Sequence, residues 1–184
     1  MKIFISGGSK SGKSICAQQL SARMQRPGAP LYYLATMIPK DSEDEKRIIR
    51  HQQGRDGWGF ETIEVENDIH RTVTDCDKRG TFLLDSVTAL LANEMFTPDG
   101  RVEPDAYKKI ADDLTKISNR IDDMIIVSDY IYSDAFLYDE LTDLYRQGLG
   151  FIGRKMATVC DVVLEASGGI CVAHKGGEIF HEFD

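Results

Sequence analysis

Short apolar segments alternate with longer amphipathic segments along the chain. The apolar segments predict strands at residues 2–6, 31–36, 60–65, 81–85, 124–128, 161–166 and 170–174. Several of them are apolar from end to end, which is typical of strands in a parallel sheet that is covered on both faces. The strand pattern therefore indicates a mostly parallel sheet.

The segments between these strands have the polar and apolar spacing of helices. They predict helices at residues 13–24, 42–53, 68–77, 86–96, 105–122 and 135–160, with an interruption in the last one at 148–153, where glycines recur. In the first helix, Ile15, Leu20 and Met24 supply the apolar positions. Ser42 and Glu45 form a capping-box pattern at the start of the second helix. Strands that alternate with helices predict an α/β fold in a single domain spanning residues 1–184.

Composition and charge exclude several classes of protein. The net charge is −8, whereas broad nucleic-acid binding needs a basic face, so we expect no nucleic-acid partner. No apolar run is long enough to span a membrane and the first residues do not form a signal peptide, so we expect a cytoplasmic protein with no membrane contact. Cys16, Cys76, Cys160 and Cys171 show no paired spacing, which favours free thiols over a disulfide framework or a zinc site.

A phosphate-binding motif follows the first predicted strand. The residues are Gly7, Gly8, Ser9, Lys10, Ser11, Gly12, Lys13 and Ser14, which match the pattern G-x-x-x-x-G-K-[ST]. Glycines let a backbone fold tightly enough for successive N–H groups to converge on one anion, and the helix that follows adds its positive end. The motif predicts a site for ATP or GTP in a P-loop NTPase-like α/β fold, with helices on both faces of the sheet.

Four side chains at this site carry candidate roles. Lys13 is expected to reach the β- and γ-phosphates, and the Ser14 hydroxyl is expected to bind Mg²⁺. Asp85 ends another apolar strand, where an acid either binds Mg²⁺ or caps the following helix. Lys10 either contacts phosphate or is a solvated loop charge.

A histidine among arginines lies in the second predicted helix. Arg47, Arg50 and His51 are followed by Gly54 and Arg55. A neutral imidazole can attack phosphorus while neighbouring arginines neutralise the charge that develops on the phosphate. The alternative is a surface histidine on a charged helix. The histidines at positions 70, 174 and 181 show no partner spacing and are interpreted as incidental.

These segments, taken in order, resemble the bifunctional adenosylcobinamide kinase / adenosylcobinamide-phosphate guanylyltransferase family. The likeness comprises the loop at 7–14, Y-L-A-T at 33–36, D-E-x-R-I-x-x-H with G-R at 44–55, F-x-T-x-E at 60–64, and L-L-D-S-V-T at 83–88 with Asn93. The loop has Lys10 where arginine is usual, and Phe60 replaces a tryptophan.

The resemblance implies both an activity and site residues. It implies phosphoryl transfer to adenosylcobinamide, and GMP transfer from GTP to its phosphate through a covalent intermediate on His51. It also implies that Ala35, Thr36, Arg55, Glu64 and Asp85 lie near the nucleotide, and that the protein is a homo-oligomer, possibly a trimer by analogy with the family.

The C-terminal third departs from the family pattern. The sequence N-E-V-G is usual after the fourth long strand, but here the residues are D-Y-I-Y at 129–132, and G-R-x-N-Q is replaced by G-F-I-G-R at 150–154. Two alternative functions therefore stay open: a P-loop kinase of another small molecule, and a nucleotide-binding regulator without turnover.

Overall fold

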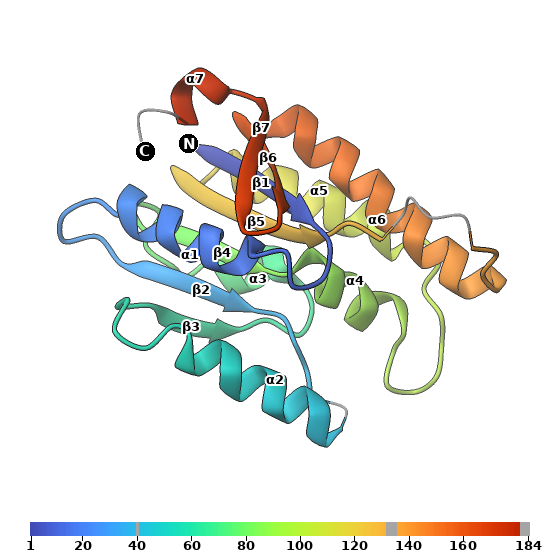
Figure 1. Cartoon of the computed structure of the whole chain (residues 1–184). Coiled ribbons are helices and arrows are strands. Elements are labelled where there is room, and N and C mark those ends of the chain that lie inside the picture. The colour runs from blue at the N-terminus through green and yellow to red at the C-terminus, as the bar shows by residue number, and fades with distance from the viewer. Residues whose placement is uncertain (40, 132–135, 181–184) are drawn as a thin grey trace.

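One twisted sheet runs through the centre of the protein (Figure 1). The computed structural model describes residues 1–39, 41–131 and 136–180, and the side chains of Arg47, Arg50, His51 and Phe180 lie outside this description. The strands are β1 (Lys2–Gly7), β2 (Leu31–Ala35), β3 (Glu61–Glu64), β4 (Thr81–Asp85), β5 (Asp123–Asp129), β6 (Val162–Ser167) and β7 (Ile170–Lys175). Their order across the sheet is β3-β2-β4-β5-β1-β6-β7.

The sheet is mostly parallel, as the apolar segments predict. Every neighbouring pair from β3 to β6 is parallel, and only β7 runs antiparallel, as the second arm of a hairpin with β6. Parallel strands bring their carboxyl ends to one edge of the sheet, where open α/β proteins bind ligands. That edge collects the P-loop after β1, Asp85 at the end of β4 and Asp129 at the end of β5.

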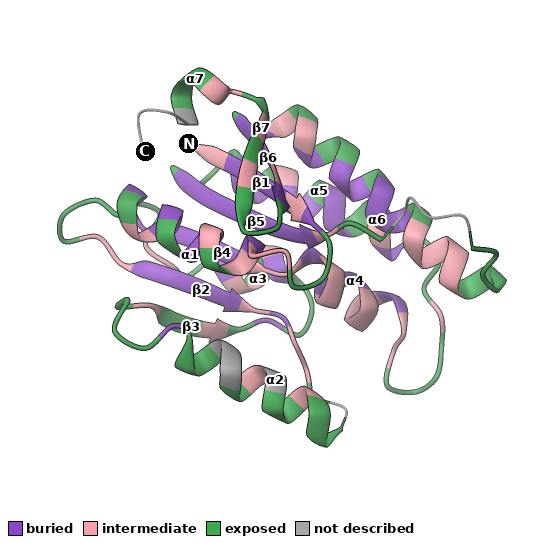
Figure 2. Cartoon of the chain, in the orientation of Figure 1, coloured by how far each residue is buried: buried purple, intermediate pink, exposed green. Residues whose placement is uncertain are grey.

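Helices cover both faces of the sheet. They are α1 (Lys13–Met24), α2 (Ser42–Gln53), α3 (Ile69–Val73), α4 (Val87–Met95), α5 (Ala106–Ser118), α6 (Glu140–Val159) and α7 (Gly177–Phe180). Helix α1 packs its apolar side on one face, and α3, α4, α5 and α6 build the larger core on the other. The buried residues lie between these layers (Figure 2).

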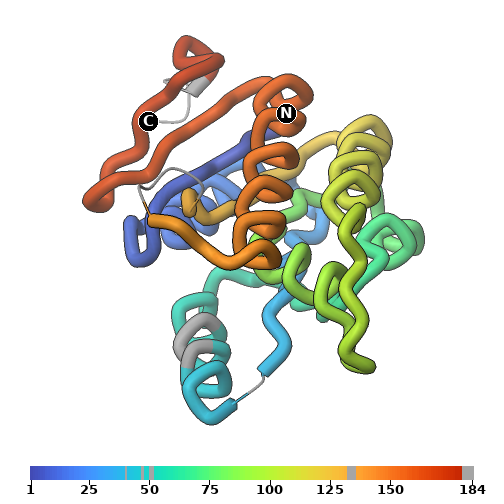
Figure 3. The backbone as a smooth tube through the Cα atoms, turned by 90° about the vertical axis from the view of Figure 1, so that its right-hand side faces the viewer, coloured from blue at the N-terminus to red at the C-terminus, as the bar shows by residue number. Residues whose placement is uncertain are grey.

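Helix α2 does not belong to either covering layer. It lies beyond the β3 edge of the sheet, whereas the β6–β7 hairpin forms the opposite edge (Figures 1 and 3). Most of its described side chains are exposed, in keeping with its charged sequence. Asp41 caps this helix, because its Oδ1 accepts hydrogen bonds from the N–H groups of Glu43 at 2.8 Å and Asp44 at 2.9 Å. The predicted cap at Ser42 is therefore wrong by one residue.

Two further predictions about helices are wrong. Helix α6 runs unbroken through residues 148–153, because glycine lets it pack closely on α5: a Cβ at Gly148 would lie 3.0 Å from Tyr107 Cβ. In α1, Ile15 is 63% exposed, because Ala17, Leu20 and Met24 form the face that meets the sheet.

No disulfide joins the four cysteines, all of which lie within the described residues. Cys16 on α1 and Cys171 on β7 nevertheless face each other, with their sulfur atoms 2.6 Å apart. Within the described residues, no helix combines the length and the apolar character needed to cross a membrane.

Candidate nucleotide site

The P-loop, residues 7–14, joins the end of β1 to the start of α1 and packs against the β6–β7 hairpin. Gly169 N donates to Ser11 O at 3.0 Å. A Cβ at Gly7 would lie 2.5 Å from Ala166 O, and a Cβ at Gly12 would lie 3.1 Å from Gly169 Cα. Gly12 also has a φ of 94°, which side chains rarely tolerate. Packing against the hairpin thus requires glycine at both positions.

The outer part of the loop faces solvent. Gly8, Ser9 and Lys10 are exposed, and a Cβ at Gly8 would have no neighbour within 4 Å. Ser11 N donates to Gly8 O at 3.3 Å in a turn. The buried Ser11 Oγ has no hydrogen-bond partner among the described residues. The outer arc, including Lys10, is therefore accessible from solvent.

Lys13 is buried and already engaged. Its Nζ forms an ion pair with Asp129 Oδ1 at 2.6 Å and donates to Gly8 O at 3.0 Å. These two contacts hold the ammonium group between the start of the P-loop and the end of β5. Ser14 is half-buried in the first turn of α1.

Asp85 is held by a tyrosine. Tyr33 donates its hydroxyl to Asp85 Oδ2 at 2.8 Å, and burial together with the Asp85 charge raises the pKa of Tyr33 well above its ordinary value. The helix after Asp85 is capped by Ser86, whose side chain accepts from Ala89 N at 3.4 Å. The capping role considered for Asp85 is therefore wrong, and its carboxylate faces the carboxyl edge of the sheet.

Arg55 contacts the tyrosine that holds Asp85. It is 9% exposed, and its guanidinium carbon lies 3.7 Å from the centroid of the Tyr33 ring. Its Nη2 also donates to Thr62 Oγ1 at 3.4 Å. A desolvated guanidinium over an aromatic face is a cation–π contact. Arg55, Tyr33 and Asp85 thus form one chain of contacts.

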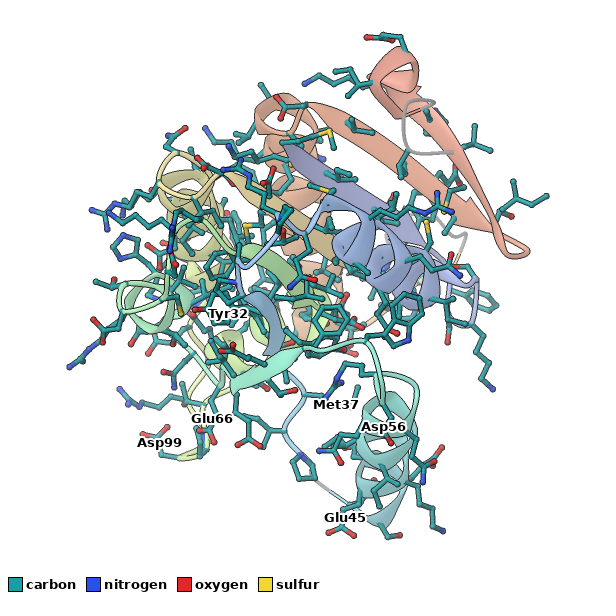
Figure 4. All side chains as sticks on the ribbon, turned by 90° about the vertical axis from the view of Figure 1, so that its left-hand side faces the viewer. Tyr32, Met37, Glu45, Asp56, Glu66 and Asp99 are labelled. Carbon is teal, nitrogen blue, oxygen red and sulfur yellow. The ribbon has the colours of Figure 1, made fainter. Side chains whose placement is uncertain are left out.

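A cavity of about 290 Å³ lies beside this chain of contacts, and we call it the α2 cavity. Its lining includes Tyr33, Ala35, Ile48, Gln52, Arg55, Glu64 and Asp85, which come from β2, α2, the turn after α2, β3 and β4. Met37 and Glu66 also line it, and Figure 4 shows Met37 close to the end of α2 that returns to the sheet at Asp56. Four predicted site residues, Ala35, Arg55, Glu64 and Asp85, are thus brought together here, whereas no residue of the P-loop lines this cavity.

Thr36 links the end of β2, beside the α2 cavity, to the start of α4. Its buried hydroxyl accepts from Ser86 N and donates to Ser86 O, both at 2.8 Å. Asn93 Nδ2 donates to Thr36 O at 2.8 Å and to Glu66 O at 3.1 Å. Thr36 is therefore part of the wall that joins β2 to α4.

His51 lies in the last turn of α2, and its side chain lies outside the described residues. Ile48 and Gln52 of the same helix line the cavity.

Sequence reasoning missed two functional candidates. Tyr33 was noted only as part of a motif, although it joins Arg55 to Asp85. Asp129 was noted only as a departure from the family pattern, although it holds Lys13. An acid at the end of an apolar strand singled out Asp85, and the same signal is present at Asp129.

The profile of the family described as "Cobinamide kinase / cobinamide phosphate guanyltransferase" matches residues 3–173. The chain belongs to this family. It is accordingly a transferase of cobalamin biosynthesis.

Curated relatives agree with this assignment. The bifunctional adenosylcobalamin biosynthesis protein CobP of Pseudomonas aeruginosa is 27% identical over 96% of this chain and 98% of its own length. CobU of Salmonella typhimurium is 24% identical over 95% of this chain and 100% of its own length. CobU of Escherichia coli is 31% identical over 58% of this chain, a match that spans 57% of that protein.

Solved structures place the fold among P-loop NTPases. One of them, described as an ATPase domain, has a TM-score of 0.52 at 12% identity, covering 89% of this chain and 68% of that one. An ATPase from a bacterial type III secretion system has a TM-score of 0.50 at 12% identity, covering 98% of this chain and 57% of that one. This likeness confirms the predicted fold class and carries no further argument.

Proposed function

We propose that this protein transfers a phosphoryl group to a hydroxyl of adenosylcobinamide and then transfers GMP from GTP to the resulting phosphate. The observation that supports it most is the family match combined with two separate sites along one sheet edge. The P-loop offers Lys13 to a polyphosphate, and the α2 cavity gathers Arg55, Glu64 and Asp85 below the helix that carries His51.

In the kinase half-reaction, the amides of residues 8–14 and the Lys13 ammonium bind the triphosphate of ATP or GTP. The acceptor hydroxyl attacks the γ-phosphorus, and the nucleoside diphosphate leaves. Ser14 and Asp85 supply a hydroxyl and a carboxylate, the hard oxygen donors that suit Mg²⁺. When bound, Mg²⁺ would neutralise charge on the phosphates.

In the guanylyltransferase half-reaction, a ring nitrogen of His51 attacks the α-phosphorus of GTP and pyrophosphate leaves. A phosphate oxygen of adenosylcobinamide phosphate then attacks the same phosphorus, and the N–P bond breaks. Arg55 supplies positive charge at the cavity wall, and its stacking on Tyr33 fixes the guanidinium plane. Ala35 and Thr36 form the wall behind the nucleotide, and Glu64 lies beside it.

Labelling of the protein tests this proposal. With α-labelled GTP and Mg²⁺, the wild type should acquire an acid-labile label, and His51→Ala should retain only background. His174→Ala is the matched control, because His174 is exposed on β7 and pairs with Glu165. If His51→Ala is labelled as strongly as the wild type, the covalent step is wrong.

The kinase half is tested separately with γ-labelled ATP and adenosylcobinamide. Label should appear in the cobinamide product with wild-type protein and with His51→Ala. A protein that labels cobinamide but never itself would be a kinase without the second activity. A protein that binds nucleotide and transfers neither group would be a regulator.

A further inference from the structure

A second carboxylate stands at the carboxyl edge of the sheet, on the strand between the P-loop and Asp85. Strand β5 pairs with β1 on one side and with β4 on the other, and Asp129 lies opposite Gly7. Asp129 N donates to Thr88 Oγ1 at 2.8 Å, and Tyr130 N donates to Gly7 O at 2.9 Å. The backbone that carries this carboxylate is therefore fixed to the start of the P-loop.

The Asp129 side chain lies beside Lys13, the residue that the proposed function assigns to the polyphosphate. Its Oδ1 lies 2.6 Å from Lys13 Nζ. An ammonium group has three donors, and among the described residues Lys13 uses two of them, on Asp129 and on Gly8 O. A phosphate oxygen that takes the third donor at the usual charge-assisted distance would lie within about 5.5 Å of the Asp129 carboxylate.

An alcohol that attacks phosphorus must lose its proton, and a carboxylate within hydrogen-bond reach can take it. We propose that Asp129 is the proton acceptor for the acceptor hydroxyl in the kinase half-reaction, an inference that rests on the proposed function. The hydroxyl oxygen forms the new bond to the γ-phosphorus, and the bond from that phosphorus to the bridging oxygen breaks. The electron pair leaves with the nucleoside diphosphate, and the proton moves to Asp129 Oδ.

The other acids at this edge of the sheet lie on or just after strands farther from the P-loop strand than β5. Asp85 accepts the Tyr33 hydroxyl, and Glu64 and Glu66 line the α2 cavity. Asp129 is 29% exposed at its side chain, so an acceptor can reach it from solvent. Tyr130 and Ile131, which follow it, are exposed apolar residues that offer a surface to a large acceptor.

The residue type at position 129 differs from the one in the N-E-V-G pattern. That pattern has an amide at position 129 and an acid at position 130, whereas this chain has Asp129 followed by Tyr130. Asp129→Asn keeps the size of the side chain and removes its charge. It also leaves the end of β5 without a carboxylate.

The experiment measures single-turnover transfer from γ-labelled ATP to adenosylcobinamide. We expect Asp129→Asn to lower the rate by about 100-fold, the ordinary size of a general-base contribution, with the ATP dissociation constant unchanged or lower. Labelling of the protein by α-labelled GTP should persist, and Asp129→Glu should recover part of the phosphoryl transfer. Asp99→Asn, which alters an exposed carboxylate paired with Arg101, is the control and should behave as wild type.

Three outcomes overturn the inference. One is phosphoryl transfer by Asp129→Asn at half the wild-type rate or more. Another is a dissociation constant for ATP that rises by the same factor as the rate falls, because Asp129 would then only position Lys13. If Asp129→Asn does not fold, Asp129→Ser serves as the second carboxylate-free variant, and retained transfer there also overturns the inference. A wild type that transfers no phosphoryl group to adenosylcobinamide is a different result, because it overturns the proposed function itself.

Discussion

The P-loop and the α2 cavity are shaped by different parts of the chain. Main-chain groups shape the P-loop: two glycines that fit under the β6–β7 hairpin, and an arc from Gly8 to Lys10 that faces solvent. Side chains shape the α2 cavity, where Arg55 stacks on Tyr33 and Tyr33 holds Asp85. The first site is continuous in sequence, and the second is assembled from β2, α2, β3, β4 and α4 together with the turns beside them.

Because of this difference, the two sites should respond differently to amino-acid substitutions. A backbone-built site depends on conformations that only glycine adopts readily, so small additions there are costly. A site built from side chains depends on particular contacts, and each contact can be removed without changing the path of the chain. Lys13 lies within the P-loop, which main-chain groups shape. Its own position nevertheless depends on a side-chain contact, because the ion pair with Asp129 orients its ammonium group.

Removal of the Lys13 ammonium should give the largest effect. Lys13→Ala is expected to lower phosphoryl transfer by about 100- to 1,000-fold, the usual cost of losing one donor that stabilises developing charge. The measurement is single-turnover transfer from γ-labelled ATP. Lys116→Ala, on the exposed side of α5, is the control. A loss below about tenfold would show that the backbone alone binds the phosphates.

Gly12→Ala tests the backbone directly. It should lower the free energy of unfolding by about 2 kcal/mol, because a left-handed conformation costs an L-residue roughly 1–2 kcal/mol and the new Cβ would meet Gly169. Gly28→Ala is the matched control, since Gly28 also has a positive φ but a Cβ there would have no neighbour within 4 Å. Denaturant unfolding and ATP titration report the two effects. Equal losses of stability and of ATP affinity in both variants would contradict a role for hairpin packing.

Tyr33→Phe tests the side-chain region. Loss of the hydrogen bond to Asp85 should lower the free energy of unfolding at pH 7 by about 1 kcal/mol. The pKa of Tyr33 is higher in the folded protein than in the unfolded chain, where it lies near 10. The contribution of Tyr33 to the free energy of unfolding is therefore complete below about pH 10 and is lost as the pH rises above that value. Denaturant unfolding between pH 9 and pH 11 should therefore show a shallower alkaline decline for Tyr33→Phe than for the wild type. Parallel curves would contradict the assignment.

The sequence predicted the regular parts of the fold, for physical reasons. Buried parallel strands such as β4 and β5 must be apolar throughout, so their pattern is unambiguous. The P-loop was predictable because its residues are adjacent in the chain. The interruption in α6 was predicted wrongly because glycine propensity is a local property, whereas the close approach of Gly148 to Tyr107 is a tertiary one.

The candidate site was predictable only in part. Glu64 was predicted through the family resemblance alone, whereas Arg55 also belonged to the local segment of arginines around His51. The contacts of Arg55 with Tyr33 and of Lys13 with Asp129 join residues far apart in the chain, so no spacing rule could reveal them. Tyr33 and Asp129, which position other side chains of the candidate site by direct contact, were therefore not predicted as site residues.

Ile15→Ala should give the smallest effect, although Ile15 immediately follows the P-loop. Its side chain is 63% exposed, so truncation removes little buried area, and alanine favours the helix slightly more than isoleucine does. The free energy of unfolding should change by less than about 0.5 kcal/mol, and the affinity for ATP should stay the same. Denaturant unfolding and ATP titration measure both. A loss above about 1 kcal/mol would mean that α1 turns a different face to the sheet, and the positions of Lys13 and Ser14 along that helix would have to be reassigned with it.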